Sequence, residues 1–137
     1  MAVTIRKADY FSMSVPNRAG SGAKVLAALK AGGVNLLAFS GFPERGGAQV
    51  DFVPENTRKF LAAAKVAKLK LSARKTVFLT QGDDRIGVIA GVLGKLAAAR
   101  ISVVSLQAVC AGKGRFGAMF WVNRKDIVRV SRLLGAR

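Results

Sequence analysis

Histidine is absent from this 137-residue chain, and cysteine occurs once, as Cys110. The missing histidine removes the commonest general base and metal ligand at neutral pH. A single cysteine excludes an internal disulfide, which suits a reducing compartment. The 7 carboxylates show no zinc-ligand spacing and no catalytic pair. The sequence therefore predicts a protein that is not an enzyme and that uses no metal and no cofactor.

Long apolar runs are lacking as well. No stretch approaches the roughly 20 apolar residues of a membrane-spanning helix. Residues 1–9 contain charges but no apolar core of a signal peptide. We therefore expect a cytoplasmic protein with no membrane partner.

Acidic residues are few relative to basic ones. The chain has 23 Lys and Arg against 7 Asp and Glu, a formal net charge of +16, while 51% of its residues are hydrophobic. Such a charge attracts anionic partners at long range, so some non-specific binding of nucleic acid is expected. The bases are spread over both halves of the chain and identify no particular partner.

What the chain does contain is an internal repeat. Asn17–Gly20, moved forward by 67 positions, coincides with Asp84–Gly87, and Val34–Leu37 then coincides with Ile101–Val104. Each copy has a polar turn, then apolar residues three or four positions apart as on one helix face, then a strand-like stretch. A fixed period of this kind predicts two copies of one module.

Propensities and turn signals predict βαββαβ in the first copy. The expected elements are strands at 3–6 and 10–15, a helix at 22–31 ending at Gly32-Gly33, strands at 34–42 and 48–53, a helix at 54–67 starting with Pro54, and a fourth strand at 68–71. In the second copy, the same signals predict strands at 75–81, 101–109 and 115–122 and helices around 89–96 and at 125–134, with no fourth strand. The expected domains are residues 1–71 and 72–137.

Four finer expectations follow from single residues. Val3–Arg6 should fill the open edge of the second sheet, in the same chain or in a second copy. Asp83-Asp84 should cap the following helix, and Cys110 should be a small buried side chain. Lys125, Arg129 and Arg132 should form a solvated helix face, with a phosphate-binding stripe as the less favoured alternative.

One segment supports an alternative function. Lys113–Phe120 resembles, with a slip of one residue, the third-strand signature of RNA-recognition motifs, and Val77–Gly82 loosely resembles their first-strand signature. Stacking on RNA needs aromatic side chains at alternate positions of the open sheet face. Arg115 and Gly117 occupy those positions here. An RNA-binding protein that uses such a sheet and its basic surface is therefore the alternative hypothesis.

The two repeated turns resemble the ACT domain. Asp84–Gly87, with the helix behind it and Ile101–Val103, shows that family's pattern, and Asn17–Gly20 with Gly33–Leu36 shows it again. The resemblance implies an α+β fold of two ferredoxin-like βαββαβ modules in tandem, with antiparallel sheets and helices on one face. It also implies a non-catalytic, regulatory protein that senses an amino acid or a similar small carboxylate. Ligands of such modules usually lie between the loop before one module's first helix and another module's second strand.

By position, the resemblance assigns ten candidate ligand residues. They are Asn17, Arg18, Ala19, Gly20 and Asn35 in the first copy, and Asp84, Arg85, Ile86, Gly87 and Ser102 in the second. In the first copy, Gly20 permits close backbone approach, Arg18 supplies a cation, and a helix N-terminus attracts a carboxylate. Ala19 and Ile86 replace the family's commoner Pro, and Ser102 replaces its commoner Asn, so the second site is expected to be weaker or vacant. A homodimer is the expected assembly.

Overall fold

The structure, a computed structural model, describes residues 3–137. It divides into two units, which we call unit N and unit C. Unit N is Asp9–Lys75, and unit C is Thr76–Arg137 together with the described residues up to Ala8. These limits differ from the domains expected at residues 1–71 and 72–137, because the first residues of the chain belong with the last ones.

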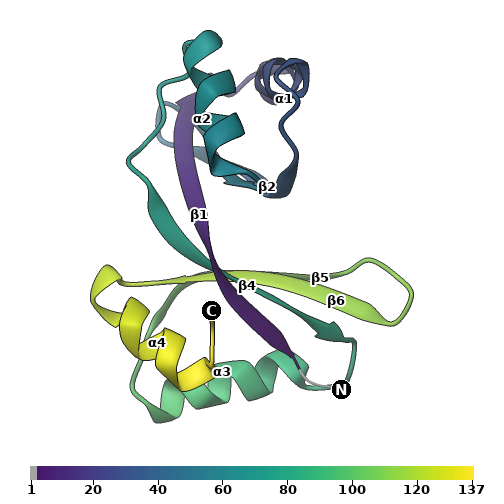
Figure 1. Ribbon diagram of the computed structural model, residues 1–137, viewed down its shortest axis with the longest axis vertical. Coiled ribbons are helices and arrows are strands. Elements are labelled where there is room, and N and C mark those ends of the chain that lie inside the picture. Colours follow the sequence, from purple (N-terminus) through teal and green to yellow (C-terminus); the bar gives the residue numbers. More distant parts are fainter. Residues whose placement is uncertain (1–2) are drawn as a thin grey trace. The chain divides into compact units, whose positions relative to one another are not determined.

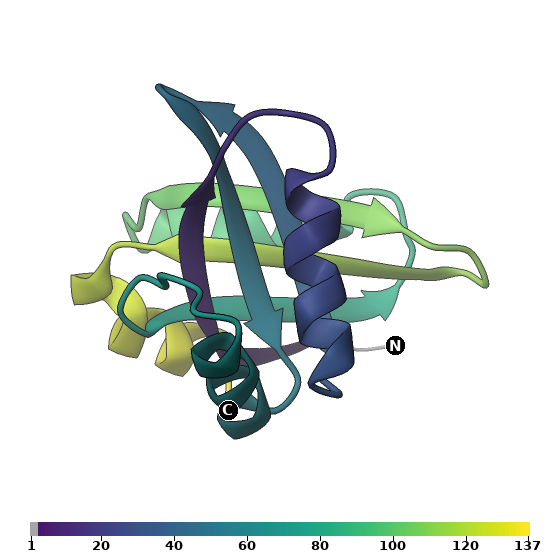
Figure 2. The ribbon, with the colours of Figure 1, turned by 90° about the horizontal axis from the view of Figure 1, so that it is seen from above.

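Unit N contains a three-stranded antiparallel sheet and two helices. Its elements are β1 (Thr4–Val15, from Asp9 onward), α1 (Ser21–Ala31), β2 (Leu36–Glu44), β3 (Gly47–Pro54) and α2 (Thr57–Val66). The strand order is β2-β3-β1. Both helices cover the same face of the sheet (Figures 1 and 2). Phe11, Phe52 and Phe60 pack there with centroid distances of 5.2 and 5.3 Å and form the centre of the core.

Unit C has the corresponding arrangement. Its elements are β4 (Lys75–Asp83), α3 (Val88–Ala98), β5 (Val103–Cys110), β6 (Arg115–Val122), a short 3-10 helix η1 (Arg124–Asp126) and α4 (Ile127–Leu134). The strand order is β1-β4-β6-β5. Both helices lie on one face of this sheet (Figure 1). Phe78 and Phe120 stack at 5.1 Å in its core. The chain is therefore α+β, with six strands and four α-helices in its described part.

The first residues of the chain complete the sheet of unit C. Ile5 is 8% exposed and packs in the same core as Phe78 and Phe120. The Lys7 amide donates to the Arg137 carbonyl at 3.0 Å. The expectation that Val3–Arg6 fills the open sheet edge is thus confirmed, within the same chain. The expected gap between two N-terminal strands is wrong, because β1 is continuous.

The repeat is reproduced in the helix boundaries. Ser21–Ala31 and Val88–Ala98 begin and end 67 positions apart. Each follows a glycine in the left-handed region, Gly20 at φ 89° and Gly87 at φ 79°. Gly32-Gly33 ends α1 as expected, because the Val34 amide reaches back to the Leu29 carbonyl at 3.0 Å.

Three expected boundaries are wrong. Pro54 ends β3 instead of starting α2, which is capped by Asn56 accepting from the Lys59 amide at 3.0 Å. Residues 68–71 form no regular strand. Next to them, the Ser72 amide donates to the Ser12 carbonyl of β1, and the Ser72 hydroxyl accepts from the Ser12 amide. The last helix begins as the 3-10 turn η1, and α4 proper starts at Ile127.

No α-helix within residues 3–137 combines the length and apolar character needed to cross a bilayer.

Candidate functional site

Two equivalent loops lie between the first strand and first helix of each unit. We call Asn17–Gly20 loop one and Asp84–Gly87 loop two. All eight residues are exposed. Each loop contains the same backbone hydrogen bond at the equivalent position. The Ser21 amide donates to the Arg18 carbonyl at 3.3 Å, and the Val88 amide donates to the Arg85 carbonyl at 3.2 Å.

Both loops lead into helix N-termini that no side chain of the described chain caps. The expectation that Asp83-Asp84 caps α3 is therefore wrong. The first amides of a helix have no intrahelical acceptor, and together with the helix dipole they favour an anion. By contrast, Asn56 caps α2. Gly20 and Gly87 have φ values of 89° and 79°, which favour glycine, and a Cβ built at either position would meet nothing within 4 Å.

Each loop lies at the same edge of its sheet as the following β-hairpin. In unit C, the Asp84 amide donates to the Gly114 carbonyl at 2.8 Å. In unit N, Val15 pairs with Ala48, just after the hairpin, and the Ser14 hydroxyl donates to Glu44 at 3.2 Å. The hairpins therefore add polar side chains to the surroundings of the loops.

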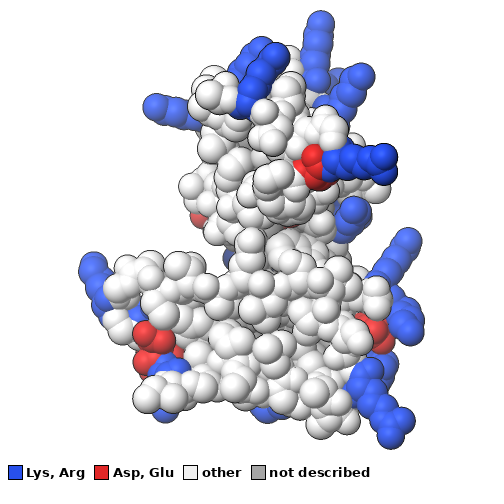
Figure 3. Space-filling view, turned by 180° about the vertical axis from the view of Figure 1, so that it is seen from behind, with Lys and Arg blue, Asp and Glu red and all other residues white. Residues whose placement is uncertain are grey.

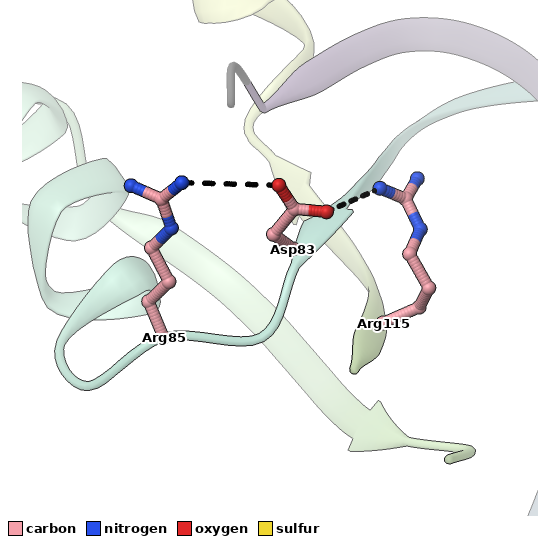
Figure 4. Close-up of polar contacts among 3 residues, drawn as sticks. All are labelled: Asp83, Arg85 and Arg115. Atoms are coloured by element: carbon pink, nitrogen blue, oxygen red, sulfur yellow. Dashed lines mark hydrogen bonds and ion pairs between the residues drawn. The ribbon is translucent and has the colours of Figure 1, made fainter. Parts of the chain in front are cut away.

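Asp83 joins loop two to the hairpin of unit C. Its carboxylate accepts from Arg115 Nη1 at 3.0 Å and lies 3.8 Å from Arg85 Nη2, with the two guanidinium groups on opposite sides (Figure 4). Both arginines are more than 45% exposed, so these pairs are screened by water and add little stability. Asp83 nevertheless forms an ion pair with Arg85, the cation of loop two.

Cys110 lies on the same hairpin and is exposed, so the expectation of a buried side chain is wrong. A hydrogen bond to the Asp84 side chain is the main cause of a raised pKa of the Cys110 thiol, and the charge of the Asp84 carboxylate raises it further. A raised pKa lowers the fraction of reactive thiolate at a given pH.

Asn35 and Ser102 lie away from the loops of their own units. Asn35 stands just before β2, where its carbonyl accepts from the Glu55 amide, and Ser102 stands just before β5. In unit N, the 11 residues of α1 separate Asn35 from loop one. That length corresponds to about 16 Å of helix. Within one unit, the structure therefore does not bring together all the residues that the resemblance assigns.

The residues that sequence reasoning missed are those of the hairpins, namely Arg115 and Cys110 in unit C and Glu44 in unit N. In a βαββ order, the first two strands run parallel, so the hairpin after the second strand returns to the loop that follows the first. The expected topology already contained this signal.

A buried carboxylate lies on the sheet of unit N. Asp51 is 5% exposed and accepts from Gln49 Nε2 at 2.8 Å and from the Ser40 hydroxyl at 3.4 Å. Nearby Tyr10 has a raised pKa, chiefly because of burial and secondly because of the charge of Asp51.

Unit C presents no free aromatic side chain on β4 or β6, the strands that resemble RNA-recognition motifs. Phe78, Phe116, Phe120 and Trp121 on these strands are each 9% exposed or less. Base stacking requires an accessible ring face. The predicted alternative therefore lacks its main contact surface on these two strands.

No family model and no curated protein matches this sequence. Solved structures do resemble it. Protein BT0572 from Bacteroides thetaiotaomicron is 17% identical, with 95% of this chain and 88% of that chain covered and a TM-score of 0.74. The regulatory subunit of aspartate kinase from Thermus thermophilus is 14% identical, with 98% and 95% covered and a TM-score of 0.65. The same subunit from Thermus flavus is 15% identical, with 98% and 94% covered and a TM-score of 0.61.

These likenesses define the class of fold. The chain has an α+β architecture shared with regulatory subunits of aspartate kinase over nearly its whole length. That architecture is the ACT-type fold, and the resemblance seen in the two repeated turns is thereby confirmed.

Proposed function

We propose that this chain is a non-catalytic regulatory protein that binds an α-amino acid or a similar small carboxylate at its repeated loops. The observation that carries the proposal is the pair of uncapped helix N-termini behind Gly20 and Gly87. A ligand carboxylate would supply the acceptor that no described side chain provides there. The neighbouring cations, Arg18 and Arg85, would add charge attraction.

Loop one is the stronger of the two proposed sites. Loop one contains no acidic residue, and Asn17 can accept from the ammonium group of an amino acid. In loop two, Arg85 is paired with Asp83, and Asp84 adds a second negative charge. Both features disfavour a ligand carboxylate at loop two.

A thermal-shift screen with amino acids, nucleotides and small organic acids tests the proposal. A ligand at about 100 times its dissociation constant should stabilise the folded chain by about 2.7 kcal/mol. For a chain of this size that corresponds to a rise in Tm of several degrees. Absence of a shift with every compound would argue against binding at either loop.

Matched arginine variants locate the site. Arg18→Gln should weaken binding at least tenfold, because it removes the only cation of loop one. Arg45→Gln removes one exposed charge from the hairpin at the same sheet edge and should change the affinity less than threefold. Equal effects of the two variants would indicate long-range attraction without a site at loop one. Arg85→Gln should leave the affinity of the stronger proposed site, loop one, unchanged.

We further propose that each unit is one ACT-like module, with the order βαββα in unit N and with a fourth strand supplied by the start of β1 in unit C, and that the chain forms a homodimer. The module proposal rests on the matching helices and on the strand orders β2-β3-β1 and β1-β4-β6-β5. In a dimer, a second copy could supply the strand residues Asn35 and Ser102 that no loop reaches within its own unit. Light scattering should give twice the chain mass of 14.4 kDa at micromolar concentration. A monomer would contradict the dimer without affecting the loop proposal.

The regulatory role itself rests on the fold and on the neighbours' description as regulatory subunits. Because the chain is proposed to lack catalysis, it would act on a separate partner, with nucleic acid bound only non-specifically through the +16 charge.

A further inference from the structure

The second helices of the two units share a surface pattern that the ligand proposal does not use. In unit N, Arg58, Leu61, Lys65 and Val66 lie on the exposed side of α2. Moved by the 67-position repeat, these residues coincide with Lys125, Val128, Arg132 and Leu133 on η1 and α4. Positions i, i+3, i+7 and i+8 share one side of a helix. We call each set a second-helix stripe.

Each stripe alternates bases with exposed apolar side chains. Leu61 and Val66 are 37% and 85% exposed in unit N, and Val128 and Leu133 are 65% and 43% exposed in unit C. Exposed apolar side chains cost free energy in water, and a partner that covers them removes that cost. The four bases of the two stripes form no ion pair within residues 3–137.

The pattern is retained in both copies of the second helix, whereas the exposed bases of the first helix are not. On α1, the exposed bases Lys24 and Lys30 correspond after the shift to Gly91 and Ala97 on α3. A general tendency of the chain toward basic residues would not select the second helices. Figure 3 shows that lysine and arginine side chains far outnumber acidic ones on the face that it presents.

In contrast to the expectation of no membrane partner, we propose that the second-helix stripes bind an anionic lipid surface. Basic side chains pair with lipid phosphates, while valine and leucine enter the boundary between headgroups and acyl chains. A nucleic-acid backbone would satisfy the bases but leave the apolar side chains in water. Two stripes packed against each other are disfavoured, because each carries two bases at equivalent positions and like charges would meet. An anionic lipid surface satisfies both chemistries of the stripe.

The experiment is co-sedimentation of the full chain with phosphatidylcholine vesicles, with or without about one third phosphatidylglycerol, at physiological ionic strength. The protein should bind the anionic vesicles and not the neutral ones. Arg58→Gln/Lys65→Gln and Lys125→Gln/Arg132→Gln should each lower the partition coefficient about 25-fold, which is about fivefold per base. The matched control Lys24→Gln/Lys30→Gln removes the same charge from α1 and should lower it less than threefold.

A second pair of variants separates lipid from nucleic acid. Val66→Ser and Leu133→Ser keep every charge and should lower vesicle binding several-fold without changing binding to a single-stranded oligonucleotide. The lipid proposal is overturned if anionic vesicles are not bound, if the α1 control matches the stripe variants, or if the serine variants bind vesicles as the unmodified chain does. Thermal melts of all variants verify folding. None of these outcomes depends on the loops, so the ligand proposal is tested separately.

Discussion

Three glycines in or beside the first helices of the two units should respond differently to the same replacement by alanine. Gly32 ends α1 at φ −85°, and a Cβ built there would lie 2.6 Å from the Cβ of Ala63 on α2. Gly33 follows at φ 72° with nothing within 4 Å of a Cβ. Gly94 lies inside α3, where a Cβ also meets nothing within 4 Å. The three sites therefore separate close packing, backbone strain and helix propensity.

The expected changes in the free energy of unfolding differ in size and in sign. Gly32→Ala forces α1 and α2 apart and should destabilise unit N by about 1 to 3 kcal/mol. Gly33→Ala places a side chain in the left-handed region, and after the gain from a less flexible unfolded chain it should cost about 1 kcal/mol. Gly94→Ala should stabilise unit C by about 0.5 to 1 kcal/mol, because alanine favours a helix interior.

Urea unfolding followed by far-UV circular dichroism measures these changes, and the single tryptophan, Trp121, reports unit C by fluorescence. Each kcal/mol should move the Tm by about 3 to 5 °C. Adding Ala63→Gly should rescue Gly32→Ala, because it removes the opposing Cβ, but should not rescue Gly33→Ala. If Ala63→Gly rescues both or neither, or if Gly94→Ala destabilises, the assignment of separate causes is refuted.

Further expectations concern single side chains. Arg100 lies after α3 at φ 57°, in the left-handed region. In paired urea titrations, the Arg100→Gly variant should therefore be about 1 kcal/mol more stable than the Arg100→Ala variant. Asp84→Asn should lower the pKa of Cys110, because it removes the carboxylate that raises it, so alkylation at pH 8 should become faster. Asp51→Ala should lower the free energy of unfolding by about 1 to 3 kcal/mol in thermal unfolding, because it leaves two partly buried donors without this acceptor. Ile5→Ala should destabilise unit C by about 2 to 4 kcal/mol in Trp fluorescence, whereas a smaller effect would contradict its place in that core.

The features that the sequence determined by itself are local ones. The repeat predicted two equivalent first helices, and their bounds do match at a spacing of 67. Arg115–Val122 was predicted with the bounds that β6 has, and the glycine pair after α1 ends it as expected. These features depend on side-chain periodicity and on φ angles, both of which neighbouring residues fix without help from the rest of the chain.

The tertiary structure decided which distant segments meet. Val3–Arg6 was expected at the open edge of the second sheet in the same chain or in a second copy, and the fit of Ile5 beside Phe78 decides for the same chain. Asp83 was read as a helix cap from its neighbours, but Arg115, 32 positions away, supplies a nearer partner. Asn35 was grouped with loop one by resemblance, whereas the length of α1 holds them apart. Each of these outcomes depends on strand pairing and on the length of intervening helices, because contacts between residues far apart in sequence form only when the sheet fixes their register.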